Sequence, residues 1–297
     1  MSQTPTLRQL RYFLALVEHR HFSHAAEACC VSQSAFSHAI RELEEALGAR
    51  LVDRTNRSVA ITNAGQDIAA HARLVLQDID ALVDTARATA APLSGRLVLG
   101  VIPTIAPYLL PRLIPALRKT YPDLSLYLRE AQSEDIVHDL ETGRIDVILL
   151  ALPYAMRNVT TLELFADPFH LAYRKGTKLI DAKNFRPNRL NADSVMLLED
   201  GHCLRDHALA ACQLADLSNV NTFAASSLGT LIEMVRADLG VTFIPDMALR
   251  AGALKGTGIA TLPLPENSAR CIGLGWRKGS GRAEEFALLG ELIRKHA

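Results

Sequence analysis

Two cysteines nine positions apart carry the most reactive chemistry in this sequence. Cys203 and Cys212 lie in the stretch DGHCLRDHALAAC, whose pattern favours a helix. Nine residues of α-helix advance the chain by about 13.5 Å and turn it through about 900°, so the two thiols would lie on opposite faces. A disulfide requires Cα atoms within about 7 Å of each other. A bond between these two cysteines would therefore require the helix to unwind.

The sequence around Cys203 predicts that this thiol is the more reactive of the two. Asp200 is expected to cap the helix, which would place Cys203 at the third helical position, where the positive helix end favours a thiolate. His202 and Arg205 are expected to add positive charge nearby. Cys212 follows Ala-Leu-Ala-Ala and is expected to be buried. The alternative is that both cysteines are small core residues, since free cysteine is commonly buried.

The cysteine count and the N-terminus predict a cytoplasmic protein. There are five cysteines with scattered spacing, which gives neither a disulfide framework nor a zinc pattern. Cys29, Cys30 and Cys271 are expected to be packing residues. MSQTPTLRQLRYF lacks the apolar core of a signal peptide, and no stretch approaches the roughly 20 apolar residues needed to span a bilayer, so no membrane partner is expected. Cytoplasmic thiols stay reduced by default.

Residues 1–65 predict a winged helix-turn-helix. Apolar residues recur at helical spacing from Leu7 to Val17, and Ser23 is expected to cap a short second helix. A third helix is expected to start after Ser32 and to end at Gly48. Two short alternating stretches then flank a polar turn and form the wing. The third helix is expected to bury four apolar side chains, those of Ala35, Ile40, Leu43 and Leu47.

This N-terminal block is expected to bind double-stranded DNA through local charge placement. The chain of 297 residues has a formal net charge of zero, and residues 1–66 carry seven arginines and six acidic residues, a balance of 7 − 6 = +1. Hydroxyl, amide and guanidinium groups contact phosphates and base edges in a major groove. The alternative is an ordinary solvated helix face. The predicted DNA-binding residues are Ser32, Gln33, Ser34, Ser37, His38, Arg41, Arg54, Thr55, Asn56 and Arg57.

Residues 66–91 predict a linker helix that forms a homodimer. Ile68, Ala72, Val75, Ile79, Leu82 and Ala86 are spaced by four and three residues in alternation, which is typical of a helix that pairs with another helix. A second copy of the chain is the simplest partner, and it would place two reading helices on a palindromic site.

From residue 96 onward, strands alternate with helices, which predicts a parallel, doubly wound α/β domain. About 200 residues suffice for two lobes with a cleft between them. We expect lobe I to comprise about 96–166 and 268–297, and lobe II about 167–267. The sequence contains no GxGxxG, P-loop, HExxH or GxSxG motif, so it predicts neither a cofactor nor a metal, and it argues against an enzyme.

These parts, in this order, resemble the LysR-type transcriptional regulators over nearly the whole chain. AAE, VSQSAFS, IRELEEALG and ITNAG fall in the register of that family's DNA-binding motif. Within the family, LLEDGHCLRD followed by Cys212, together with VIPTIAPYLLP and EAQS, resembles the branch that senses hydrogen peroxide. The fold implied is a winged helix-turn-helix, a linker helix and a two-lobed domain like those of periplasmic binding proteins.

The resemblance implies that Cys203 is oxidised by peroxide to a sulfenic acid, which then condenses with Cys212. It also implies a homotetramer and contact with RNA polymerase. Thr104 and Ser133 would face the cysteine and hydrogen-bond the peroxide, although the family often has threonine where Ser133 stands. The other expected pocket residues are His202, Arg205, Asp206 and Arg270.

Two further functions remain open from the sequence. The protein could be a regulator of the same family that binds a small metabolite between the lobes, with structural cysteines. It could also be a thiol peroxidase or a small-molecule hydrolase on this scaffold, although such an enzyme would have no use for the N-terminal block.

Overall fold

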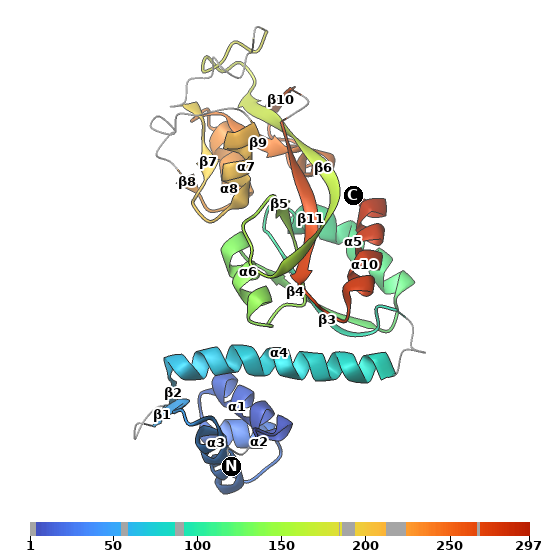
Figure 1. Ribbon diagram of the computed structural model, residues 1–297. Coiled ribbons are helices and arrows are strands. Elements are labelled where there is room, and N and C mark those ends of the chain that lie inside the picture. The colour runs from blue at the N-terminus through green and yellow to red at the C-terminus, as the bar shows by residue number, and fades with distance from the viewer. Residues whose placement is uncertain are drawn as a thin grey trace. The chain divides into compact units, whose positions relative to one another are not determined.

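The N-terminal part of the chain, in a computed structural model, folds into three helices, a two-stranded hairpin and one long helix (Figure 1). The structure describes residues 4–54, 59–86, 92–183, 185, 194–211, 224–265 and 268–297. The N-terminal elements are α1 (Leu7–His19), α2 (Phe22–Ala28), α3 (Gln33–Leu47), β1 (Val52–Arg54), β2 (Val59–Ile61) and α4 (Asn63–Ala86). The predicted helix-turn-helix with its hairpin wing is confirmed.

The ends of α3 follow the sequence prediction, whereas the start of α2 does not. Ser32 caps α3 through its hydroxyl, and Gly48 ends it in the left-handed conformation at φ 62°. The predicted cap of α2 by Ser23 is wrong, because His21 precedes that helix and makes no side-chain cap. The Ser23 hydroxyl instead donates to Gln33 Oε1 at 3.0 Å, which joins α2 to the first residue of α3.

The core of the N-terminal part is centred on α3. Phe36, Ile40 and Leu43 are fully buried, and their spacing of four and three residues keeps them on one helix face. Ala35, predicted to be buried, is exposed because it lies one position before that stripe. The remaining fully buried core side chains of this part are Phe13, Leu16, Ala25 and Leu51.

The long helix α4 begins at Asn63, three residues before the predicted start, and is described as far as Ala86. Part of its predicted dimer seam is open to solvent in the single chain. Val75 is 43% exposed and Leu82 is 64% exposed. No helix among the described residues is both long and apolar enough to cross a membrane.

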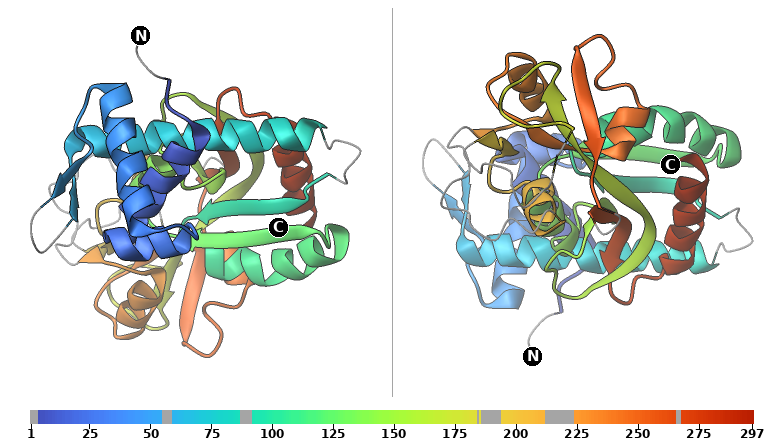
Figure 2. Two further views of the ribbon diagram at one scale, coloured as in Figure 1. Left: turned by 90° about the horizontal axis from the view of Figure 1, so that it is seen from below. Right: turned by 90° about the horizontal axis from the view of Figure 1, so that it is seen from above.

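The chain divides into two compact units, Met1–Ala90 with Glu141–Arg144, and Ala91–Leu140 with Ile145–Ala297. The second unit has two hydrophobic cores, one for each lobe. In lobe I, α5 and α10 lie side by side on one face of the sheet, and α6 lies on the other (Figures 1 and 2). The lobe I elements are β3 (Gly95–Val101), α5 (Ala106–Thr120), β4 (Leu124–Glu130), α6 (Ser133–Glu141), β5 (Val147–Leu152), β11 (Ala269–Arg277) and α10 (Ala283–His296).

The main sheet is mixed rather than wholly parallel as predicted. Its strands run in the order β10-β6-β11-β5-β3-β4, with β9 also on β6. β3 is parallel to β4 and to β5, but β11 is antiparallel to both β5 and β6 (Val159–Arg174). The parallel prediction failed because β11 returns from lobe II antiparallel to β5 and β6, and because β9 and β10 pair antiparallel with β6.

Lobe II is built on the second half of β6. Residues 159–168 of β6 pair with β11 in lobe I, whereas 169–174 pair with β9 and β10. A separate pair of two-residue parallel strands, β7 and β8, lies beside α7 and α8 (Figure 1). The lobe II elements are β7 (Leu197–Leu198), α7 (Cys203–Ala211), β8 (Ala224–Ala225), α8 (Leu228–Arg236), β9 (Thr242–Pro245), α9 (Asp246–Arg250) and β10 (Ile259–Pro263).

A close approach of two backbone segments predicts that Gly65→Ala destabilises the N-terminal unit. A Cβ atom at Gly65 would lie 2.3 Å from the Leu51 carbonyl oxygen and 2.8 Å from Ile61 Cγ2. The backbone must shift to relieve this overlap, at a cost of about 1–3 kcal/mol. Thermal unfolding followed by circular dichroism measures the loss. Gly229→Ala is the control, because a Cβ atom at that helical position meets only Ser227 Oγ, at an ordinary contact distance of 3.8 Å, and alanine should gain up to about 1 kcal/mol there. Equal midpoints for the two variants would contradict the prediction.

Candidate functional site

The candidate reactive thiol is the first residue of α7. Cys203 is free and only 3% exposed. The prediction that Asp200 caps this helix is wrong, because the chain turns at Gly201 with φ 94°. Asp200 is 93% exposed, and its carboxylate pairs with Arg205 Nη1 at 2.7 Å. Cys203 therefore occupies the first helical position rather than the third, and it is still at the positive end of the helix.

Helix α7 packs into the cores of both lobes. The Cys203 side chain belongs to the buried core of lobe I. Leu204 and Ala208, which share a different face of the helix, belong to the core of lobe II. The thiol of a lobe II helix thus lies at the boundary with lobe I.

A buried ion pair lies next to the thiol. The Arg270 guanidinium is fully buried and donates to Asp167 Oδ2 from Nε at 3.0 Å and from Nη2 at 2.9 Å. Arg270 also donates to the Thr104 hydroxyl at 2.8 Å and to the Thr104 carbonyl at 3.0 Å. Asp167 Oδ1 accepts from the Met247 amide at 2.8 Å. Both charges are therefore paired and hydrogen-bonded, as burial requires.

This ion pair lies where β6 passes from one lobe to the other. Arg270 and Asp167 are cross-strand neighbours on β11 and β6. Two residues beyond Asp167, Phe169 begins the pairing of β6 with β9. Sequence analysis missed Asp167, because an acidic residue within a strand gives no local sign of a partner 103 positions away.

The surroundings of Cys203 favour its thiolate. Burial raises the pKa of the Cys203 thiol, but interactions with His207 and Ser133 and the positive charge of Arg270 lower it more, so the net shift is downward. The Ser133 hydroxyl is 1% exposed and has no partner in normal hydrogen-bond geometry among the described residues. Its proton is available to a thiolate or to a small ligand beside it.

His207 is a site residue that sequence analysis did not select. It follows Cys203 by four positions on α7, so the two side chains share one helix face. Its Nε2 lies 3.1 Å from the Pro153 carbonyl oxygen. Burial lowers the pKa of His207, but the Cys203 thiolate and the Pro153 carbonyl raise it more, so it lies above the ordinary value. The four-residue spacing from Cys203 is the sequence signal that would have identified it.

His202 does not supply the positive charge predicted for it. It is 5% exposed, and burial lowers its pKa more than Glu199 and the Ser226 backbone raise it. Its Nε2 lies 3.2 Å from Gln132 Nε2, so this lobe I amide contacts the chain just before α7. Gly201 has φ 94°, a left-handed conformation that favours glycine, and a Cβ atom there would also displace the Gln132 side chain.

The other predicted site residues are placed as follows. Arg205 is bound to Asp200, and Asp206 is exposed, so the structure does not direct either toward the thiol. Cys212 lies outside the described residues. Cys29 and Cys271 are half-buried, whereas Cys30 is exposed and in the left-handed conformation, contrary to its expected packing role. No group of three His, Cys, Asp or Glu residues in the described part of the chain could hold a metal ion.

The candidate DNA-binding face lies on α3. Ser32, Gln33, Ser34, His38 and Arg41 are exposed there, and Ser37 is half-buried. His38 is 3.2 Å from Glu42, and Arg41 Nε donates to the Ser37 carbonyl at 3.4 Å. Arg54 ends β1, but its side chain lies outside the described part, as do Thr55, Asn56 and Arg57.

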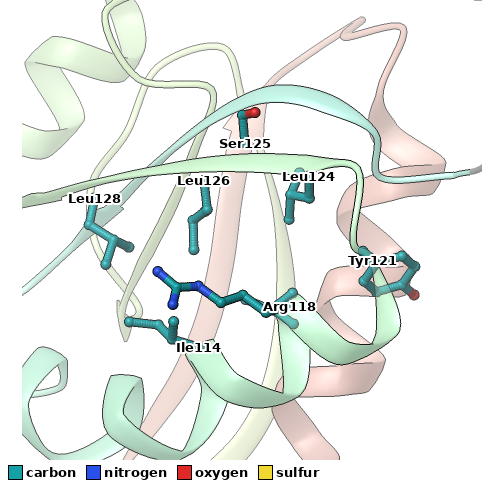
Figure 3. A pocket seen from close by; sticks show the side chains of 8 residues that line it. Ile114, Arg118, Tyr121, Leu124, Ser125, Leu126 and Leu128 are labelled. Atoms are coloured by element: carbon teal, nitrogen blue, oxygen red, sulfur yellow. The ribbon is translucent and has the colours of Figure 1, made fainter.

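A cavity of about 300 Å³ lies elsewhere in lobe I, between α5 and β4 (Figure 3). The Arg118 side chain extends across it, under the leucines of β4. None of the residues predicted for the site lines this cavity. Its lining residues are Ile114, Leu117, Arg118, Tyr121, Leu124, Ser125, Leu126 and Leu128.

Both parts of the chain match models of one protein family. Residues 7–66 match the bacterial regulatory helix-turn-helix protein of the lysR family, and residues 90–297 match the LysR substrate binding domain. Together these two matches cover nearly the whole chain.

Named relatives are similar over their full length. The chain is 39% identical to the HTH-type transcriptional regulator EstR of Acinetobacter baylyi over 297 residues, covering 99% of this chain and 98% of the relative. It is also 39% identical to the hydrogen peroxide-inducible genes activator of Escherichia coli O6:H1 over 289 residues, covering 97% and 94%. A full-length OxyR from Pseudomonas aeruginosa with a cysteine-to-aspartate substitution has a TM-score of 0.83 at 32% identity, covering 99% of this chain and 96% of that one.

The buried ion pair predicts a large loss of stability for Arg270→Met. Removal of the guanidinium leaves the Asp167 carboxylate buried and without its cation, which costs about 3–5 kcal/mol. Urea unfolding of the full chain measures the change in the free energy of unfolding. Arg236→Met is the control, because Arg236 and Glu233 form an exposed pair and its loss should cost at most about 0.5 kcal/mol. Similar losses for the two variants would contradict the prediction.

Proposed function

The chain belongs to the LysR family of DNA-binding transcriptional regulators, and we propose that it regulates transcription in response to hydrogen peroxide through Cys203. Members of this family are regulators rather than enzymes, and their helix-turn-helix binds DNA. The observation that carries the proposal is the setting of Cys203: a thiol buried at the start of α7, with a pKa lowered by its neighbours. Such a thiol is a ready nucleophile toward peroxide.

The proposed peroxide site lies beside Cys203. The Ser133 hydroxyl is buried and has no partner in normal hydrogen-bond geometry among the described residues, so it can donate to a peroxide oxygen beside Cys203. The Thr104 hydroxyl accepts from Arg270, which leaves its own proton free to donate. Two hydroxyls near a buried cation would stabilise the negative charge that develops on the leaving oxygen. These roles are supported by the burial of both hydroxyls and by the hydrogen bond from Arg270 to Thr104.

The proposed switch is a disulfide between Cys203 and Cys212. Helix α7 extends from Cys203 to Ala211, so eight residues separate these Cα atoms along the axis by about 12 Å. The next Cα atom lies about 3.8 Å from that of Ala211 in any conformation. The two cysteine Cα atoms are therefore at least about 8 Å apart while α7 is intact, beyond the reach of a disulfide. Oxidation would require α7 to unwind.

The proposed assembly is a homodimer through α4 that further pairs into a homotetramer. The exposed Val75 and Leu82 on α4 support a helix partner. Two DNA-binding heads per dimer suit a palindromic operator. A change in α7 would alter the regulatory units, and through them the spacing of the heads on DNA and contact with RNA polymerase.

A second candidate function is a response to a small metabolite, with the cysteines structural. Two observations favour it: residues 90–297 match the LysR substrate binding domain, and the regulator EstR, whose name mentions no peroxide, is as similar to this chain as the peroxide-inducible activator is. In this case a ligand would stabilise the protein equally with and without the Cys203 thiol.

We expect Cys203→Ser to abolish the transcriptional response to peroxide while DNA binding is retained. The serine hydroxyl is isosteric with the thiol but is not oxidised by peroxide, so the response is lost. Residue 203 lies far from α3 in the sequence, so DNA binding is retained. A reporter assay measures the response, and a mobility-shift assay measures binding. Cys271→Ser is the matched control and should respond normally. Full induction by Cys203→Ser would eliminate this thiol as the sensor and favour the metabolite function.

We expect one equivalent of peroxide to join Cys203 to Cys212 and to open α7. Peptide mapping by mass spectrometry should find the disulfide. Hydrogen exchange should rise over residues 203–211, because the bond cannot form on the intact helix, and should stay unchanged over α8 as the internal control. A disulfide with unchanged exchange in α7 would show that the unwinding step is wrong.

A further inference from the structure

One ring nitrogen of His207 is buried and has no partner in normal hydrogen-bond geometry among the described residues. This nitrogen is Nδ1, and it is inaccessible to solvent. The other nitrogen, Nε2, lies 3.1 Å from the Pro153 carbonyl oxygen. A carbonyl can only accept, so Nε2 carries the proton of the neutral ring. Nδ1 therefore carries the lone pair of the neutral ring inside the protein.

His207 lies on the same helix face as the Cys203 thiol. The two residues are four apart on α7 and share a helix face, and the His207 side chain interacts with both the sulfur and the backbone of Cys203. We propose that His207 is the proton acceptor and donor for Cys203 in its reaction with hydrogen peroxide. This inference rests on the proposed peroxide-sensing function and names a residue that acts in it.

The proposed proton path balances. The Cys203 thiol proton moves to His207 Nδ1 and leaves a thiolate beside an imidazolium. The thiolate sulfur attacks one peroxide oxygen, so that an S–O bond forms as the O–O bond breaks. The sulfur is oxidised to a sulfenic acid, and the other oxygen leaves as hydroxide. His207 Nδ1 returns its proton to this hydroxide, which gives water. The sum is thiol plus peroxide to sulfenic acid plus water.

Other groups near Cys203 do not serve as this base. Arg270 has only hydrogen-bond donors, and Asp167 is occupied by Arg270 and by the Met247 amide. His202 contacts Gln132 and has a lowered pKa. Tyr154 has a pKa raised by burial first, then by the charges of Cys203, Glu134 and Asp206, so it stays neutral. Among these groups, His207 is the base that shares a helix face with Cys203 and has a buried nitrogen without a partner in normal hydrogen-bond geometry.

The shifts in pKa agree with this pairing. The pKa of Cys203 is lowered by His207 and that of His207 is raised by Cys203, so the thiolate and the imidazolium stabilise each other. Reaction with peroxide should slow as the pH falls through the thiol pKa, because the nucleophile is protonated. It should slow again as the pH rises through the His207 pKa, because the proton donor to the leaving hydroxide is lost.

The test is the pH profile of Cys203 reactivity in full-length His207→Gln. A glutamine amide can still donate to the Pro153 carbonyl, but it cannot take up the thiol proton. Alkylation by iodoacetamide, quantified on the Cys203 peptide, reports the thiolate without peroxide. Stopped-flow oxidation with hydrogen peroxide reports the reaction. His170→Gln is the matched control, since His170 pairs with Asp246 in lobe II. Circular dichroism checks that each variant is folded.

In His207→Gln we expect the midpoint of alkylation to rise by at least about one pH unit, which lowers reactivity about tenfold below it. Oxidation should fall in parallel, and the alkaline limb of its profile should disappear. His170→Gln should match the unmodified protein. Unchanged profiles in folded His207→Gln would overturn the proposal. If the alkylation midpoint rises but the unmodified protein does not react with peroxide, His207 activates the thiol and the peroxide function fails.

A second measurement applies if His207→Gln does not fold. NMR titration of the His207 ring in the unmodified protein and in Cys203→Ser reports the pairing from the histidine side. The His207 midpoint should fall in Cys203→Ser, because the thiolate that raises it is gone. An unchanged midpoint would overturn the proposal.

Discussion

The Arg270–Asp167 ion pair fixes the geometry on which the candidate site depends. It lies on adjacent strands at the point where β6 leaves lobe I for lobe II, and it is fully enclosed. Two buried charges are tolerated only if both are satisfied, and here Thr104 from lobe I and the Met247 amide of α9 complete the set. The pair therefore orders both lobes around the same few atoms. It also supplies the positive charge beside Cys203.

Helix α7 connects this fixed centre to the rest of lobe II. One of its faces places Cys203 in the core of lobe I, while Leu204 and Ala208 anchor it in lobe II. Gln132 of lobe I contacts His202 just before the helix, and the Pro153 carbonyl contacts His207 one turn after its start. Contacts with lobe I thus occur before, at and after the thiol. Oxidation of Cys203, as proposed, would change the residue at the centre of these contacts.

Much of the fold follows from local sequence patterns, whereas much of the site does not. The predicted third helix, which starts after Ser32 and ends at Gly48, matches the structure, because its apolar spacing and end residues act within a few positions. The antiparallel course of β11 was missed, because alternation along a strand does not encode the direction of its neighbour. The cap by Asp200 was wrong, because a left-handed glycine directs the chain elsewhere. Asp167 was missed because its partner Arg270 lies 103 positions away in the sequence. His207 was missed because its position on the same helix face as Cys203 was not considered.

The short length of α7 limits the free energy that is needed to unwind it. A helix of nine residues is too short to be stable alone in water, since isolated helices become marginal below about 12–15 residues. The helix is therefore stabilised by the packing of its two faces against the two lobes. One extra atom on a side chain that is 3% exposed strains a well-filled core by about 1–3 kcal/mol. If Cys203 is oxidised as proposed, strain of that size would favour the unwinding of so short a helix.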